Sequence, residues 1–524
     1  MSSEDIQEAG KEIATNGENP IPDSNSTSSD IKKLGKQTII YGGSTILSRL
    51  LNYLLVPLHT YIFAEASQYG VVGELYAWTS LFMVILTYGM ETAFFYFSRD
   101  KEIRDKVYST IVTSLVCTSS LFIIICSCCS GSIASWLQYP DHPEYIVWFS
   151  IIIGVDALTS IFFARLRNLE KPWRFALVKI TNIIVNVLCN LFFLLLCPYL
   201  LRNNPDSFIS TIYNPSIGVG YIFISNLIAS IVTLALLLPS FFKQRYEFDF
   251  ALWKKMFRYA LPMLVFGLAG IVNETMDRVL LKNFSVTENP QASVGIYSAC
   301  YKISILMTIF VQAFKYAAEP FFFNKSKEAN PQKAYAEIMT AFVFICSILF
   351  VGIMLYMDII QYFVGPEYRV GLPIVPILLM ANLFLGIFYN LSIWYKLTAQ
   401  TKFGAYIAIF GAIITLVLNI LLIPRIDYMG SAWATFFCYL SMMIVSYFWG
   451  QKYYPVNYEV KKVILYIVLA AGVYGLSVLI TKGLHIETMW ARLSVNTLLM
   501  IVYMGTLFML NRRRIMQVLR RQNG

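Results

Sequence analysis

The sequence predicts an all-α polytopic membrane protein, and three observations lead to this fold class. Of the 524 residues, 57% are hydrophobic and only 14% are charged, whereas a soluble domain carries about a quarter charged residues. Apolar runs of about twenty residues, the length with which an α-helix crosses a bilayer, recur from Ile39 almost to the C-terminus. The short segments of alternating hydrophobicity that are typical of a transmembrane barrel do not occur.

The apolar runs predict about fourteen transmembrane helices. Their approximate ranges are 36–62, 70–97, 107–129, 144–168, 173–197, 216–239, 256–282, 292–320, 334–363, 370–396, 404–424, 430–450, 461–482 and 489–511. The loops between them are short, and the longest predicted outer loop runs from Pro198 to Pro215. The chain therefore leaves no room for a catalytic domain outside the membrane, and we do not expect an enzyme.

Basic residues are concentrated in alternate loops, which indicates the topology. Loops assigned to the inside hold several each, as at 99–106, 165–174 and 452–462. Loops assigned to the outside hold single basic residues such as Arg202, Lys282, Arg369, Arg425 and Lys482. This contrast predicts an even number of helices with both termini in the cytoplasm. The net charge of +10 thus reflects membrane topology, and we expect no nucleic-acid partner.

The N-terminal residues and the cysteines carry no sign of a further site. Residues 1–31 are rich in Ser, Asn, Glu and Pro and lack the apolar core of a signal peptide, so we expect a disordered cytoplasmic tail. The nine cysteines all lie in apolar runs, where small thiols pack as hydrophobic side chains. We therefore expect no disulfide framework, no metal site and no cofactor.

An internal repeat divides the predicted helices into two sets of six. Gly70 and Gly295 are 225 residues apart and stand in similar segments, and Tyr76 and Tyr301 have the same separation. Six helices per unit give both copies the same orientation, as in parallel transporter repeats. We predict a cytoplasmic tail (1–31), a first lobe (32–249) and a second lobe (250–452) related by a pseudo-two-fold axis. Two extra C-terminal helices and a basic cytoplasmic tail complete the chain (453–524).

The segment Tyr259–Phe284 carries three charged residues in an otherwise apolar helix. Glu274, Asp277 and Arg278 have the spacing i, i+3 and i+4, which puts them on one helix face. Charged groups inside a membrane are costly unless they face a partner or water, so this helix is expected to border a polar cavity. Alternatively, Arg278 only forms a local salt bridge with Glu274.

Further charged residues lie at membrane depth in other predicted helices. Arg49 and Lys302 are near the middle of their helices without an acidic residue within a turn, and Lys179 lies one to two turns from the inner end. With Arg278 they could bind an anionic substrate, because Arg grips phosphate oxygens bidentately and Lys supplies a point charge. Asp156 is either a counter-ion or a proton-coupling carboxylate. Applied to Arg49, the repeat offset leads to the region of Glu274, which makes Glu274 and Asp277 candidates for gating or ion coupling.

Two other groups of polar residues allow more than one interpretation. Asn182, Asn186 and Asn190 form a stripe along one helix, and either interhelical hydrogen bonding or substrate contact explains it. Glu91, Lys315 and Lys396 lie close enough to the inner surface for their side chains to reach the interface, so we do not include them in the predicted site.

Two stretches of the chain resemble a known family. The first runs from Tyr41-Gly-Gly through Ser48-Arg-Leu-Leu-Asn-Tyr-Leu-Leu-Val-Pro-Leu58 to Gln68-Tyr-Gly70. The second joins Asp277-Arg-Val-Leu-Leu-Lys-Asn-Phe284 to Val294-Gly-Ile-Tyr-Ser-Ala-Cys-Tyr-Lys-Ile303. In order and spacing they resemble the Wzx-like oligosaccharide flippases of the MOP superfamily, which is related to MATE exporters and the lipid II flippase MurJ. The resemblance covers nearly all of the chain after residue 35.

This resemblance implies a two-lobed alternating-access transporter with a cationic central cavity. Its substrate would be an undecaprenyl-diphosphate-linked oligosaccharide, moved from the cytoplasmic to the outer leaflet of the bacterial inner membrane for cell-surface polysaccharide biosynthesis. Arg49 and Arg278 match helices that carry cavity charges in such proteins. Expected partners are the lipid-linked substrate, membrane lipids, a coupling H⁺ or Na⁺ and polysaccharide polymerase machinery, with a monomer as the functional unit. The two extra helices resemble those of MurJ-like members, whereas many Wzx-like members have twelve.

Other functions remain alternatives. A lipid II flippase shares the expected architecture. A MATE-like exporter of organic cations needs an unpaired carboxylate in its cavity, and such exporters often place one in the first helix, where this chain has Arg49 and no acid. A membrane glycosyltransferase or polymerase needs a large outer loop or acidic catalytic motifs, which the sequence lacks. A passive scaffold does not explain charged residues at mid-membrane depth.

Overall fold

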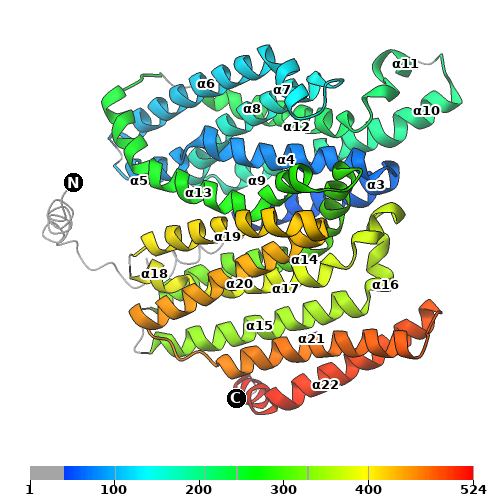
Figure 1. Ribbon diagram of the computed structural model, residues 1–524. Coiled ribbons are helices and arrows are strands. Elements are labelled where there is room, and N and C mark those ends of the chain that lie inside the picture. The colour runs from blue at the N-terminus through cyan, green and yellow to red at the C-terminus, as the bar shows by residue number, and fades with distance from the viewer. Residues whose placement is uncertain are drawn as a thin grey trace, which may run out of the picture.

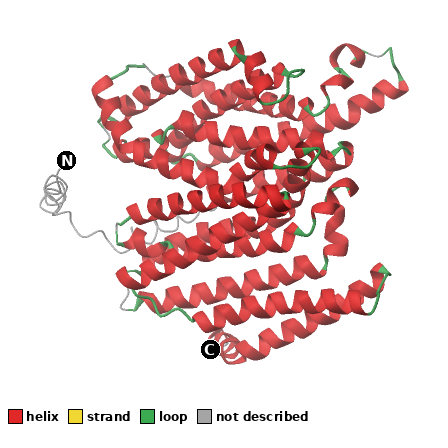
Figure 2. Cartoon of the chain, in the orientation of Figure 1, coloured by secondary structure: helices red, strands yellow, loops and turns green. Residues whose placement is uncertain are grey.

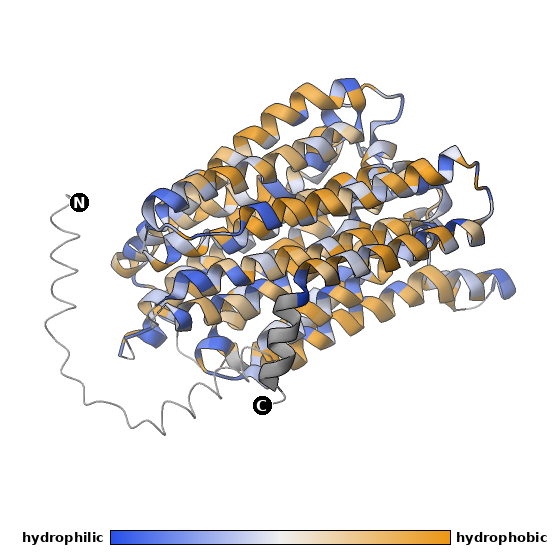
Figure 3. Cartoon of the chain, turned by 90° about the horizontal axis from the view of Figure 1, so that it is seen from below, coloured by the Kyte–Doolittle hydropathy of each residue, from blue (hydrophilic) through white to orange (hydrophobic). Residues whose placement is uncertain are grey.

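The computed structural model describes residues 40–100, 102–206, 208–242, 246–326, 330–398 and 400–522. Within these ranges the regular structure is entirely helical and contains no strand (Figure 2). The predicted all-α fold is therefore confirmed, while the predicted tail 1–31 lies outside the described residues. Hydrophobic residues dominate the helices and hydrophilic residues gather at helix ends and in loops (Figure 3), as expected for helices surrounded by lipid.

Thirteen of the described helices are long and apolar enough to cross a membrane. A further apolar segment, 40–62, is helical on both sides of a turn at Leu54. Pro57 explains this interruption, because proline has no N–H to donate to the carbonyl of Tyr53 and its ring crowds that carbonyl. With this interrupted helix, the structure agrees with about fourteen predicted crossings and confirms a multi-pass membrane protein.

The first lobe occupies the upper part of Figure 1. It starts with residues 40–53, and α4 and α5 form one crossing that bends at Tyr88 and Gly89, both with positive φ. The remaining bounds are α3 (Leu55–Ile62), α4 (Ala66–Thr87), α5 (Met90–Phe97), α6 (Arg104–Cys128), α7 (Ser130–Trp136), α8 (Pro143–Asn168), α9 (Pro172–Leu191), η1 (Phe192–Leu196), α10 (Cys197–Asn203), α11 (Ile209–Ile212), η2 (Pro215–Ile217) and α12 (Gly220–Phe241).

The second lobe and the C-terminal helices follow below it (Figure 1). The second lobe comprises α13 (Phe250–Phe284), α14 (Pro290–Lys325), α15 (Pro331–Leu355), α16 (Met357–Ile360), η3 (Gln361–Phe363), η4 (Pro366–Gly371), α17 (Ile374–Leu391), α18 (Ile393–Leu397), α19 (Lys402–Ile426) and α20 (Tyr428–Tyr453). Then come α21 (Val460–Gly483) and α22 (Met489–Gln522). They pack against α15, where Tyr503 bonds to Ser347 over 2.9 Å and Asn496 donates to the carbonyl of Leu355 over 2.8 Å.

The contact between α4 and α14 agrees with the predicted repeat. A Cβ atom on Gly70 would lie 2.0 Å from the carbonyl oxygen of Gln291, and one on Gly295 would lie 1.9 Å from that of Ala66. Ala66 and Gln291 are themselves 225 residues apart, so the contact of Gly70 with Gln291 is repeated as the contact of Gly295 with Ala66, and the two helices meet symmetrically. This contact is near the ends of the helices that the basic-residue pattern assigns to the outside, called the outer end below.

Helix α13 connects the two lobes along its length. Near its start Trp253 donates a hydrogen bond of 2.8 Å to Ser114 on α6 of the first lobe. Further along, Asn273 donates over 3.1 Å to the carbonyl of Ala408 on α19 of the second lobe. Pro262 lies between these contacts within the helix, where proline weakens the hydrogen-bond ladder. The part of α13 that carries Glu274, Asp277 and Arg278 is therefore anchored in the second lobe.

We predict that Gly295→Ala destabilises the protein by roughly 1–3 kcal/mol, the range for overpacking a tight contact. The added methyl group would meet the backbone of Ala66, which cannot move away as a flexible side chain can. Thermal unfolding in detergent measures the effect. Gly472→Ala on α21 is the matched control, because its Cβ would meet no atom within 4 Å. A melting temperature of G295A equal to that of G472A would refute the tight-contact argument.

Candidate functional site

A cavity of about 380 Å³ lies between the two lobes. The segment 40–62 and helices α4, α9 and α12 contribute residues from the first lobe, and α13 and α14 contribute residues from the second. Each helix brings its polar residues to this one place because polar side chains are costly against lipid and face the bundle interior instead. The cavity is where a substrate could contact both lobes at once.

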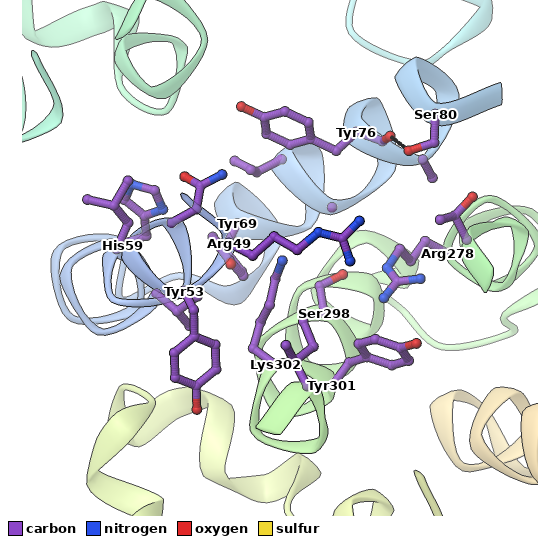
Figure 4. A pocket seen from close by; sticks show the side chains of 18 of the residues that line it. Arg49, Tyr53, His59, Tyr69, Tyr76, Ser80, Arg278, Ser298, Tyr301 and Lys302 are labelled. Atoms are coloured by element: carbon purple, nitrogen blue, oxygen red, sulfur yellow. Dashed lines mark hydrogen bonds between the residues drawn. The ribbon is translucent and has the colours of Figure 1, made fainter. Parts of the chain in front are cut away.

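Three of the four predicted cationic residues line this cavity. Arg49 comes from the first lobe, and Arg278 and Lys302 come from α13 and α14 of the second. Figure 4 shows the side chains of Arg49 and Lys302 directed into the same space, with Arg278 opposite them. Charges that are distant in sequence therefore converge on one volume that is large enough for a phosphate-sized group.

Arg278 is held in place by its neighbours. It forms an ion pair of 2.7 Å with Asp277, and its Nη1 also donates to the backbone carbonyl of Glu274 over 3.1 Å. Tyr297 donates to the second oxygen of Asp277 over 2.5 Å, and the ring of Tyr301 lies 4.4 Å from the guanidinium carbon. The alternative that Arg278 forms a local salt bridge with the carboxylate of Glu274 is therefore replaced by the pair with Asp277.

Lys302 and Arg49 carry charges that no acidic partner neutralises among the described residues. Among the described residues, the ammonium group of Lys302 has no hydrogen-bond or ion-pair partner, although the residue lines the cavity. Arg49 donates a hydrogen bond to the neutral side chain of Gln312 on α14. Its charge is thus not neutralised by an acidic partner there. Both groups can contact an anion without first breaking an ion pair.

Glu274 is the one acidic residue among those that line the cavity. Its side chain is exposed, and its carboxylate has no hydrogen-bond or ion-pair partner in the described part of the chain. The 225-residue offset relates Glu274 to Arg49, so the equivalent positions of the two lobes present opposite charges to one space. A cation or an acidic proton could bind at Glu274 beside an anionic substrate.

Lys179, Asp156 and Asp277 do not line the cavity. Lys179 on α9 lies 4.3 Å from the ring centroid of Phe163 on α8, and Asp156 lies on α8 of the same lobe. Neither residue joins Arg49 at the cavity. Their depth in the membrane was read from the sequence, but the direction of each helix face was not, which is why the predicted grouping with Arg49 does not occur.

The asparagine stripe on α9 contains one residue that bonds between helices and two that line the cavity. Asn182 donates over 2.8 Å to Thr233 on α12, which is an interhelical hydrogen bond. Asn186 and Asn190 line the cavity, and Asn190 forms a hydrogen bond of 2.8 Å with His59. Sequence reasoning missed His59. The sequence held one signal for it: His59 lies at a membrane depth about one helical turn from the outer end of the asparagine stripe and faces the same interior.

The rest of the wall consists of uncharged groups that can bind hydroxyl groups or pack on sugar rings. Two hydroxyl groups in it, those of Ser298 and Thr308, are buried without a hydrogen-bond partner within the described ranges. Sequence reasoning did not single out these wall residues, because hydroxyl and aromatic residues are common throughout the chain. Besides these two they are Asn52, Tyr53, Tyr69, Tyr76, Ser80, Thr275, Tyr301 and Gln312.

A buried ion pair joins the lobes beside the cavity, toward the outer end. Lys282 on α13 lies 2.8 Å from Glu74 on α4, and the side chains are only 7% and 1% exposed. Tyr139 donates a hydrogen bond to the same carboxylate, and Lys282 also donates to the carbonyl of Leu137. The sequence assigned Lys282 to an outer loop. This was wrong, because α13 continues to Phe284 and the lysine turns inward to its partner.

The described residues contain no cluster of three or more His, Cys, Asp or Glu side chains that could hold a metal ion. The cavity instead offers cations, amides and hydroxyl groups. Such a set can bind phosphate oxygens and sugar hydroxyls by hydrogen bonds and charge.

Solved structures with the same fold define the class of the protein. The lipid II flippase MurJ, in an inward closed conformation, superposes with a TM-score of 0.67 at 15% identity, covering 91% of this chain and all of that one. An inward-facing MATE family multidrug resistance transporter gives 0.56 at 13% identity, covering 79% and 94%. A MOP superfamily transporter from Pyrococcus furiosus, described as having a binding pocket of reverse polarity, gives 0.51 at 14%, covering 80% and 94%. The protein has the fold of a MOP superfamily membrane transporter.

Residues 34–326, more than half of the chain, match the family of polysaccharide biosynthesis proteins. The chain therefore belongs to this family, and the resemblance to flippases of the MOP superfamily is confirmed. No curated protein matches the sequence. The chain is thus a multi-pass membrane protein of the polysaccharide biosynthesis family, with a fold that it shares with MurJ and MATE transporters.

We predict that Glu74→Ala destabilises the protein by about 3–5 kcal/mol, because it leaves the buried ammonium of Lys282 without a counter-charge. The double variant Glu74→Met/Lys282→Met, which removes both charges, should recover most of this loss. Thermal or denaturant unfolding in detergent compares the variants. Glu144→Ala is the control, since its pair with His142 is 38% exposed on each side and should contribute at most about 1 kcal/mol. Equal effects of E74A and E144A would show that the buried pair does not hold the lobes.

Proposed function

We propose that the protein is an alternating-access flippase for an undecaprenyl-diphosphate-linked oligosaccharide. It would move this lipid from the cytoplasmic to the outer leaflet of a bacterial inner membrane, with both of its own termini in the cytoplasm, for cell-surface polysaccharide biosynthesis. The observation that carries the proposal is the inter-lobe cavity with the unneutralised cations Lys302 and Arg49. Membership of the polysaccharide biosynthesis family supports the glycan part of the substrate.

The residues have separate roles in this proposal. Lys302 and Arg49 bind the diphosphate directly, because neither has an acidic partner to give up. Arg278 contributes a charge whose position is fixed by Asp277 and the tyrosine rings. The asparagine, tyrosine and hydroxyl side chains of the wall contact the sugar next to the diphosphate. Since the binding residues come from both lobes, the bound headgroup remains in contact with both while they rock.

Coupling and gating are assigned to the acidic residues. Glu274 faces the same cavity without a partner, so it would bind the coupling H⁺ or Na⁺ and thereby alter the net charge next to the diphosphate. Asp277 acts through Arg278, which it positions. Asp156, inside the first lobe, is the further candidate for ion coupling, and Lys179 has no assigned substrate contact because it does not line the cavity.

Two alternative functions can be distinguished from this proposal, one by the sign of the charge in the cavity and the other by the substrate. A MATE-like exporter of organic cations would face three cationic side chains and one carboxylate here, which disfavours a cationic substrate. A lipid II flippase would use the same diphosphate contacts, and the match over the whole of MurJ makes it the second candidate. Lipid II and an oligosaccharide-diphosphate lipid, assayed side by side, distinguish these two.

We predict that Lys302→Gln and Arg49→Gln each reduce translocation at least about tenfold, because each removes a charged contact to the diphosphate. The measurement is flipping of an undecaprenyl-diphosphate-linked oligosaccharide in proteoliposomes that contain the purified protein. Lys482→Gln on α21 is the matched control, since Lys482 is exposed and outside the cavity. Folding is checked by size-exclusion chromatography. Wild-type rates in both cavity variants would rule out this site assignment, and efflux of an organic cation without flipping would favour the exporter.

A further inference from the structure

A second small cleft lies on α14, beyond the cavity and toward the opposite end of the bundle from the outer end. It is bordered by Lys315 and Glu319 on α14, by Tyr389 and Asn390 on α17, and by Lys396 on α18. The sequence placed the two lysines close enough to the inner surface for their side chains to reach the interface. In the structure both are partly exposed and also contact groups of the bundle.

Lys315 has a charge without a counter-charge. Its Nζ lies 4.5 Å from the ring centroid of Tyr389, and among the described residues it has no hydrogen-bond or ion-pair partner. Beside it, the side-chain oxygen of Asn390 is buried without a hydrogen bond. The cleft therefore contains an open ammonium, which can bind an anion, beside an amide oxygen that lacks a donor, which is unusual because buried polar groups are normally bonded.

Lys396 is occupied by a carboxylate that it can give up. It lies 2.7 Å from Glu319, and the two side chains are 26% and 38% exposed. A partly exposed pair of this kind holds together only weakly, because water solvates both charges when they separate. A phosphate that entered the cleft could thus replace Glu319 at Lys396 and contact Lys315 at the same time.

The cleft and the cavity share one face of α14. Lys302, Ile305, Ile309 and Gln312 line the cavity, and Lys315 and Glu319 continue the same three- and four-residue spacing into the cleft. At 1.5 Å per residue, Lys315 lies about 20 Å along the helix from Lys302. Arg49 bridges this distance, since its partner Gln312 is one turn from Lys315. Cationic groups thus follow a single route from the cleft to the cavity.

We propose that Lys315 and Lys396 form a peripheral diphosphate subsite, which receives the headgroup of the lipid-linked substrate before Arg49 and Lys302 do. This inference rests on the proposed function and adds a second binding step to it. The closed cleft has a volume of only about 20 Å³, which is room for a single water. Binding therefore requires Glu319 to leave Lys396, and Glu319 acts as the resident anion that the substrate displaces.

The test uses the full-length protein in nanodiscs of phosphatidylcholine, with farnesyl diphosphate as the water-soluble probe and isothermal titration as the readout. We expect two sites in the wild type. Lys315→Gln/Lys396→Gln should lose the peripheral site and keep the central one, whereas Arg49→Gln/Lys302→Gln should do the reverse. Each loss should be at least about tenfold in affinity. Lys402→Gln, at an exposed lysine at the same end of the bundle, is the control.

Glu319→Gln gives a readout that a merely structural ion pair would not produce. It removes the competing carboxylate and frees Lys396, so the peripheral site should bind farnesyl diphosphate more tightly, by about threefold to tenfold. In proteoliposomes, Lys315→Gln/Lys396→Gln should raise the substrate concentration needed for half-maximal flipping while the maximal rate changes little. Weaker binding by E319Q would overturn the displacement mechanism.

Three outcomes separate this inference from the proposed function. A single site that only Arg49→Gln/Lys302→Gln removes would overturn the peripheral subsite and leave the flippase proposal standing. No binding of farnesyl diphosphate at either place, together with no flipping, would overturn both. If phosphatidylglycerol in the nanodisc displaces the probe from the peripheral site at ordinary membrane content, the cleft binds bilayer headgroups, and its role as a substrate station is refuted.

Discussion

The need to neutralise or hydrate every charge inside the membrane shapes this protein. Three acidic residues meet basic partners, in the pairs Asp277–Arg278, Glu74–Lys282 and Glu319–Lys396. Each pair lowers the cost of keeping its charges away from bulk water. Lys302, Glu274 and Lys315 have no such partner among the described residues, and all three face a cavity or cleft. These three unpaired charges therefore lie where water or a ligand can reach them, whereas the pair Glu74–Lys282 joins the two lobes.

The repeat supplies a symmetric frame, and the side chains break that symmetry. Helices α4 and α14 meet through equivalent glycines, yet the equivalent positions 49 and 274 carry Arg and Glu. Symmetric packing lets the lobes rotate about a common axis. Opposite charges at equivalent positions make one lobe present a cation and the other an acid to the same ligand, so the ligand's charge can affect the two lobes differently.

Much of the fold could be predicted from the sequence. The length of the apolar runs, the basic residues in the loops and the repeated glycine segments can each be recognised without knowing how the helices pack. The same holds for Arg49 and Lys302, whose depth and lack of near acidic neighbours pointed to a cavity, and for Arg278, whose charged helix face did so. Depth alone does not say which way a helix face turns, and Lys179 and Asp156 accordingly lie apart from that cavity.

The pair Glu74–Lys282 and the cleft at Lys315 depend on contacts between helices far apart in the chain. In a single sequence each of these residues looks like an ordinary charge near a helix end. The alternation of apolar and charged residues fixes roughly where a helix ends, but α13 extends past its predicted end and carries Lys282 inward. Tertiary packing alone determines such partners, so sequence reasoning could not name them.

The glycine contact between α4 and α14 has a mechanical consequence. At Gly70 and Gly295 backbone meets backbone, so at these two positions no side chain has to change its rotamer for the helices to part. Both helices keep their internal hydrogen bonds when they separate. Near this joint, separation would expose the buried charges of Glu74 and Lys282. If the lobes separate at this end, the free energy of separation would be concentrated in the hydration of this single pair of charges.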